Sequence, residues 1–337
     1  MTIPYRTQRV LKRILLGLLA LTVLLLTAWV CWSLWVQRYV VYLADGTVVI
    51  DFTKGPIQEG QTAIQPEKME VPVHFVQQDE LVDTSAELTQ MVGYYVELSE
   101  LQDIEAVKAQ IQALPVGTPV MVDVKNIKGA FYYSSAVSAT RSSQIHTEAF
   151  DELITTIKRS GMYAIARFPA LRDYTYGLNH VPDGVHHISG GYLYMDDDGC
   201  YWLHPGSEGT LTYLTNIIME LRALGFDEVV LEDFCFPQTT SIRTDGDKAE
   251  HLSRAAKILT QTCVSERFAV SFVKTADFTV PEGRTRVYMT GMDASQAAAA
   301  AANSGVEDTA VKLVFLTELH DTRFNVYSVL RPLSGAG

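Results

Sequence analysis

Residues Gly225–Pro237 read Gly-Phe-Asp-Glu-Val-Val-Leu-Glu-Asp-Phe-Cys-Phe-Pro. Glycine commonly ends a helix, and the segment Glu228–Leu231 has the length and apolar content of a short buried strand. Glu232 and Asp233 follow that strand directly. Because functional side chains in parallel α/β folds lie at the carboxyl ends of the strands, these two adjacent carboxylates are the first candidates for an active site.

Strand and helix patterns alternate on both sides of this stretch. Apolar residues recur at helical spacing between the predicted strands, and we expect the helix that begins at Thr147, its predicted N-cap, to end at Gly161. Helices are predicted near residues 104–114, 147–160, 211–224, 247–263 and 293–303. Strands are predicted at residues 93–98, 119–124, 162–168, 228–231, 268–272, 286–289, 311–316 and 324–330.

This alternation over residues 91–332 predicts an α/β protein, a (β/α)8 TIM-type barrel. An open doubly wound sheet is the alternative. The sequence has neither the glycine fingerprint of a Rossmann fold nor a Walker loop, so nothing in it supports nucleotide binding. In the barrel interpretation Glu232 ends the fourth strand and Glu318 follows the seventh.

The N-terminal segment has the pattern of a membrane anchor. Residues 14–36 form a run without charged side chains that is long enough for a helix to cross a bilayer. Four basic residues precede this run. We therefore predict that residues 1–36 form a cytoplasmic basic tail and a transmembrane helix, with the remainder outside the cytoplasm. A cleaved signal peptide is the alternative, although the apolar run is long for one and no Ala-x-Ala site closes it.

Residues 37–90 are predicted to be a hairpin followed by a spacer. Two β-rich runs, Tyr39–Leu43 and Thr47–Phe52, flank Asp45-Gly46, and one further strand is predicted at Val71–Val76. The three cysteines after the anchor, Cys200, Cys235 and Cys263, allow at most one internal disulfide. The net charge of −12 argues against nucleic acid as a partner.

Acidic side chains gather at the predicted strand ends, as glycoside hydrolysis requires. One carboxyl group protonates the leaving oxygen and a second acts as nucleophile or activates water. Glu232 is the predicted general acid/base, Asp123 and Asp233 are candidate partner carboxylates, and Glu318 is a candidate nucleophile. For Glu232 the structural alternative is capping the next helix or pairing with Arg167, and for Glu318 it is a solvated loop position.

Other polar and aromatic residues near the strand ends are candidates for substrate binding. Lys125 lies two positions after Asp123, so both side chains can face one side of a strand, either toward a sugar or in a salt bridge. Trp202, in the long loop 173–205, is a candidate stacking platform, or else packs that loop onto the barrel. The complete set of predicted binding residues is Lys125, Arg167, Asp173, Trp202 and His204. We expect no metal and no cofactor.

Four stretches of the chain resemble a family of bacterial glycoside-hydrolase-like barrels, often secreted or anchored to the membrane. They are Val122–Lys125 with Gly129, Ile165–Phe168 followed by Arg172-Asp173, Trp202–Pro205, and Gly225–Pro237. The resemblance covers about residues 91–332 and implies a barrel that acts on carbohydrate.

The chain departs from the family pattern within the stretch Gly225–Pro237. Where the family has Asp-Tyr-x-Arg-Phe-Pro, this chain has Glu232, Asp233 and Cys235 in place of aspartate, tyrosine and arginine, and His204 replaces an asparagine. The loss of the arginine removes a fixed cation. The sequence thus predicts a membrane-anchored carbohydrate-active barrel with a polysaccharide or oligosaccharide substrate. A non-catalytic barrel that binds cell-wall polysaccharide or scaffolds envelope proteins is the alternative, and a deacetylase would need a metal constellation that the sequence does not show.

Overall fold

The computed structural model describes residues 88–274 and 278–335, the strand residues 40–42 and 48–50, and a few helical residues between 22 and 32. The chain divides into two compact units, Met1–Gln78 and Asp79–Gly337. In the first unit β1 (Val40–Tyr42) and β2 (Val48–Ile50) pair antiparallel, which confirms the hairpin. Most of the predicted anchor, at residues 14–36, and the predicted strand at Val71–Val76 lie outside the described residues. None of the helices in the described part of the chain has the length and apolarity needed to span a bilayer.

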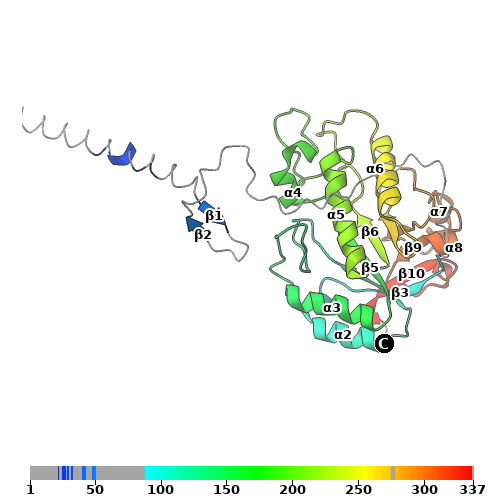
Figure 1. Ribbon diagram of the computed structural model, residues 1–337. Helices are drawn as coiled ribbons and strands as arrows, with labels where there is room; N and C mark the ends of the chain where they lie inside the picture. The colour runs from blue at the N-terminus through cyan, green and yellow to red at the C-terminus, as the bar shows by residue number, and fades with distance from the viewer. Residues whose placement is uncertain are drawn as a thin grey trace, which may run out of the picture. The chain divides into compact units, whose positions relative to one another are not determined.

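Eight parallel strands of the second unit close into a barrel in the order β10-β3-β4-β5-β6-β7-β8-β9 (Figure 1). The (β/α)8 prediction is confirmed, and the closed sheet excludes the doubly wound alternative. The strands are β3 (Val92–Tyr95), β4 (Pro119–Asp123), β5 (Tyr163–Pro169), β6 (Glu228–Glu232), β7 (Ala269–Val273), β8 (Val287–Thr290), β9 (Leu313–Leu316) and β10 (Ser328–Pro332). The parallel neighbours β9 and β10 are joined by a short connection that holds the 3-10 turn η3 (Thr322–Phe324).

Helices connect most of the other strands and cover the outside of the sheet. They are α2 (Ile104–Ala113), α3 (Thr147–Arg159), α4 (Tyr174–Asn179), α5 (Glu208–Leu224), α6 (Lys248–Cys263), α7 (Ala297–Ala302) and α8 (Thr309–Lys312). Helix α5 ends at Gly225, whose φ of 95° is the left-handed conformation that glycine adopts without strain. The predicted N-cap Thr147 is wrong by one position, because Thr147 is already helical and His146 holds the extended cap conformation.

The core has two layers that follow from the alternation of side chains along each strand. One set of strand residues packs outward against the helices, and the other fills the barrel interior. The interior set includes Met121, Ile165, Val230, Val273, Val314 and Leu330.

A buried polar network lies at the N-terminal end of the barrel. The Glu228 carboxylate, fully buried at the start of β6, pairs with Arg286 Nη1 at 2.6 Å and accepts hydrogen bonds from three hydroxyl groups. These hydroxyls belong to Tyr163, Ser271 and Tyr288. Since a buried charge is tolerated only with such partners, this network stabilises the end of the barrel opposite the strand mouths.

Candidate functional site

Three charged side chains meet where neighbouring strands β4, β5 and β6 end. Asp123 and Arg167 are register partners, and the guanidinium binds the carboxylate through two hydrogen bonds of 2.6 and 3.0 Å. Arg167 Nη1 also lies 3.6 Å from Oε1 of Glu232, the last residue of β6. The structure therefore brings together three of the predicted site residues, which we call the mouth cluster. It also confirms that Glu232 ends the fourth barrel strand.

Burial and charge act in opposite directions on Glu232. Burial raises the pKa of its carboxyl group, the Arg167 guanidinium lowers it, and the carboxylates of Asp123 and Asp233 raise it again, so that the pKa lies above its ordinary value. The side chain still has 35% of its surface exposed. A carboxyl group that keeps its proton to higher pH and remains accessible can act as a proton donor.

The shared guanidinium limits how far apart the two carboxylates can lie. Contacts of 2.6 Å to Asp123 and 3.6 Å to Glu232, with the width of one guanidinium between them, keep the nearest carboxylate oxygens within roughly 9 Å. Glycosidases place their two carboxyl groups at about 5–5.5 Å in retaining enzymes or about 6.5–9.5 Å in inverting ones. The mouth cluster is thus compatible in size with a pair of catalytic carboxyl groups.

Asp233 lies beside the cluster in an unusual backbone conformation. Its φ is +50°, a left-handed value that is uncommon for a residue other than glycine. Burial raises the pKa of its carboxyl group, while the charges of Arg172 and Lys125 lower it. The proposed role of Asp233 as a partner carboxylate stays a prediction.

Tyr95 and Glu318 face the same end of the barrel. Tyr95 is the last residue of β3, and burial raises the pKa of its hydroxyl, with the charges of Glu97 and Glu318 adding to the effect. Glu318 follows β9, the seventh barrel strand as predicted, and is exposed. Sequence reasoning missed Tyr95 although it ends a predicted strand, because a half-buried tyrosine has the same pattern as a core residue.

Lys125 and Asp173 do not line the mouth, which corrects their prediction as substrate-binding residues. Both side chains are completely buried, and Lys125 Nζ lies 2.8 Å from Asp173 Oδ2. The hydroxyl of Tyr213 donates to the same oxygen at 2.8 Å, and the other carboxylate oxygen accepts the N–H of Tyr176 as the N-cap of α4. A sealed ion pair with these partners holds the loop after β5 and cannot reach a substrate.

Trp202 is likewise buried, with 8% of its surface exposed, so the prediction of an exposed stacking platform is wrong. Its indole N–H donates to Asp196 Oδ2 at 2.9 Å, and the Arg172 guanidinium lies over its ring at 5.6 Å. Arg172 also pairs with Asp196 at 2.7 Å. These contacts make the alternative correct: Trp202 packs the long loop onto the barrel.

His204 is half-buried against other rings. Its ring centre lies 5.4 Å from that of Phe236 and 5.0 Å from that of His251, and Nδ1 accepts the N–H of Gly206. Burial and the neighbouring His251 lower the pKa of its imidazole, which keeps the ring neutral at pH 7. A role of His204 in substrate binding stays a prediction.

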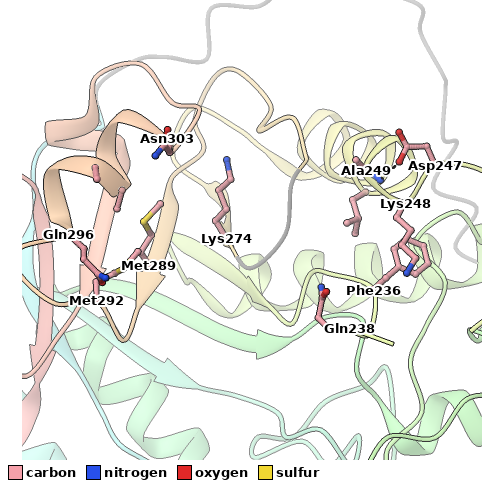
Figure 2. Close-up of a pocket in the computed structure, with 13 residues that line it drawn as sticks. Phe236, Gln238, Asp247, Lys248, Ala249, Lys274, Met289, Met292, Gln296 and Asn303 are labelled. Atoms are coloured by element: carbon pink, nitrogen blue, oxygen red, sulfur yellow. Dashed lines mark hydrogen bonds between the residues drawn. The ribbon is translucent and has the colours of Figure 1, made fainter. Parts of the chain in front are cut away.

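A hollow of about 880 Å³ opens at the same end of the barrel, after strands β6, β7 and β8 (Figure 2). Its lining comes from the loop after β6, the start of α6 and the segments around β8 and α7, and does not include the mouth cluster. Across the described residues, no group of three His, Cys, Asp or Glu side chains is arranged to hold a metal ion. The three cysteines of the barrel are buried, and no disulfide joins any two of them.

Residues 94–280 match the model of one protein family, described as "Putative glycosyl hydrolase domain". A comparison with curated proteins finds no match.

Solved structures that match this chain include a hypothetical protein from Ruminiclostridium thermocellum, with 18% identity and a TM-score of 0.46 over 53% of this chain and 96% of that chain. An α-galactosidase from Lactobacillus brevis gives 9% identity and a TM-score of 0.48 over 73% of this chain and 38% of that chain. The glycoside hydrolase domain of PelA from Pseudomonas aeruginosa gives 10% identity and a TM-score of 0.38 over 72% of this chain and 94% of that chain. The chain thus spans well under half of the α-galactosidase, and identities this low say nothing about activity.

Proposed function

The chain belongs to the family described as a glycosyl hydrolase domain, whose model covers more than half of it, and from this premise we propose that the barrel hydrolyses a glycosidic bond in a carbohydrate. One observation carries the proposal. Glu232, with a raised pKa and an accessible side chain, shares a guanidinium with a second carboxylate at the mouth of the barrel.

Each member of the mouth cluster has a role in the proposed reaction. Glu232 donates its proton to the glycosidic oxygen as the bond to the anomeric carbon breaks. Asp123 accepts a proton from the water that attacks the anomeric carbon, so that one water is added across the broken bond. Arg167 positions both carboxylates, and it holds Asp123 through two hydrogen bonds.

The proposal is tested by a hydrolysis screen of neutral and acidic glycans with the wild-type chain and Glu232→Gln. General acid–base catalysis contributes about 10²–10⁴-fold, so the variant should lose at least a hundredfold in kcat on any glycan that the wild type cleaves. The matched control is Glu266→Gln, an exposed glutamate just before β7, at the opposite end of the barrel. Equal activity of Glu232→Gln and wild type would exclude Glu232 from the mechanism.

A second candidate function is a barrel that binds polysaccharide without cleaving it. It is favoured by the pairing of both Asp123 oxygens with Arg167, since a carboxylate held in this way also suits a fixed binding surface. Glycan binding without product release by the wild type would support this function over hydrolysis.

We also propose that residues 14–36 anchor the barrel in the cell membrane, with the N-terminus in the cytoplasm. The support is the uncharged run and its basic N-terminal flank. Protease added to intact cells should then degrade the barrel and spare an N-terminal epitope tag, and protection of the barrel would contradict the proposed orientation.

A further inference from the structure

The hollow after β6, β7 and β8 has the composition of a ligand site. Phe236 and Met289 are buried apolar residues on its surface, and amides from Gln238 and Asn303 stand at its edges (Figure 2). Sites for small ligands are mostly apolar concavities of about 300–1,000 Å³ with a few polar groups that fix orientation. A hollow of about 880 Å³ lies within this range and is large enough for more than one sugar ring.

Two ammonium groups also line the hollow. Lys248, the first residue of α6, places Nζ 5.8 Å from the centre of the Phe236 ring. Lys274, directly after β7, donates one hydrogen bond of 2.6 Å to the carbonyl oxygen of Ser304. An ammonium group has three donors, and neither lysine forms an ion pair with any described residue. Within the part of the chain that the structure describes, both lysines therefore keep donors available to a ligand.

Among the described residues that line the hollow, one side chain carries a negative charge. Asp247 is the N-cap of α6, and its carboxylate already accepts the N–H of Ala249 at 2.9 Å. The described part of the lining thus carries two cations and one anion, in a chain whose net charge is −12. Since charges are screened beyond about 8 Å at physiological ionic strength, the local excess of cations decides what enters, rather than the acidic remainder of the protein.

We propose that this hollow binds an anionic substituent, a carboxylate or a phosphate, on a sugar of the glycan. Lys248 and Lys274 contact the anion, and the amides of Gln238 and Asn303 bind hydroxyl groups of the sugar. Phe236 follows Glu232 by four residues on the loop after β6, which places the hollow next to the mouth cluster. The hollow's role as a subsite rests on the proposed hydrolase function, whereas its preference for anions does not.

The test measures binding by calorimetry to the purified chain at physiological ionic strength. The probes are tetragalacturonate, the matched neutral α-1,4-galactotetraose and galactose 6-phosphate. Tetragalacturonate or the phosphate sugar should bind the wild type and Glu232→Gln equally well. Lys248→Gln and Lys274→Gln should each bind about tenfold more weakly, as expected for losing a hydrogen bond to a charged group.

Matched variants separate recognition from folding. Lys257→Gln makes the same charge change at an exposed position of the same helix and should leave binding unaltered. Lys274→Arg retains the charge and should retain most of the affinity, so a lost fold is distinguished from a lost contact.

Each outcome bears on one of the two proposals. Equal affinity for the charged and neutral tetrasaccharides, unchanged binding by both glutamine variants, or no binding of either anionic probe would overturn the anionic subsite. Cleavage of neutral glycans together with any of these results would leave the hydrolase function standing. Binding of an anionic probe that depends on both lysines, with no glycan of the hydrolysis screen cleaved, would support the subsite and contradict hydrolysis. The probe that binds, carboxylate or phosphate, identifies the substituent.

Discussion

The buried pair Lys125–Asp173 offers the sharpest test of which charged residues stabilise the barrel and which bind substrate. Asp173→Asn removes the charge and keeps the shape of the side chain. The asparagine can still cap α4, because asparagine and aspartate are equally good N-caps. With its oxygen on the Tyr176 N–H, the amide group points its N–H donors at the Lys125 ammonium and the Tyr213 hydroxyl, which lose their acceptor.

The magnitude follows from complete burial. Both side chains have no exposed surface, so Lys125 would remain as an unpaired buried cation. Breaking such a pair costs about 3–5 kcal/mol, a large part of the roughly 5–15 kcal/mol that stabilises a folded domain. The double variant Lys125→Met/Asp173→Asn removes both charges and should recover part of this loss.

Urea unfolding followed by circular dichroism measures these differences as shifts of the midpoint at constant slope. A free energy of unfolding of Asp173→Asn within about 0.5 kcal/mol of wild type, the range of ordinary surface substitutions, would refute a stabilising role for the buried pair. If that stable variant also showed a raised KM on a cleaved glycan, Asp173 would be a substrate-binding residue after all.

Four further variants test other parts of the site. Because burial raises the pKa of Glu232, its ionisation destabilises the folded state as pH rises through that pKa. Glu232→Gln should therefore raise Tm at pH 8 and leave Tm unchanged at pH 4. An equal shift of Tm at both pH values, measured by calorimetry, would contradict this. Arg167→Met removes the cation that lowers the pKa of Glu232, and it should move the alkaline limb of the pH profile of kcat/KM to higher pH. An unmoved limb would show that Arg167 does not influence the group that titrates there. Trp202→Ala should lower the free energy of unfolding by about 3–5 kcal/mol in urea, whereas an exposed platform would change only KM. Gly129 has a φ of +78° and its added Cβ would meet the Asp173 carboxylate, so Gly129→Ala should lower Tm in thermal unfolding, and an unchanged Tm would refute the contact.

Local signals in the sequence were sufficient for most of the architecture. The helical stripes, the glycine after α5 and the short apolar runs placed the eight strands within a few residues of their observed ends. Since such runs alternate with helices at a regular spacing, their order also predicted the closed parallel barrel and the position of Glu232 at the fourth strand end.

The exposure of polar and aromatic side chains could not be read in the same way. Lys125 and Trp202 stand near strand ends or in a long loop, where their residue types suit substrate binding. Their burial depends on how the loop after β5 folds back, and the partner of Lys125 is Asp173, 48 positions along the chain. A sequence pattern reports which face of a strand a residue takes, and it contains no information on what covers that face.

The sequence by itself therefore determined the strands, their order and the strand mouth at which Glu232 stands, because propensity and periodicity act between residues near one another in the chain. Only the tertiary structure decided which charges meet there. It brought Arg167 between Asp123 and Glu232, sealed Lys125 against Asp173, and set Lys274 and Lys248 around one hollow. These contacts join separate strands and loops, and their geometry depends on the closure of the whole barrel.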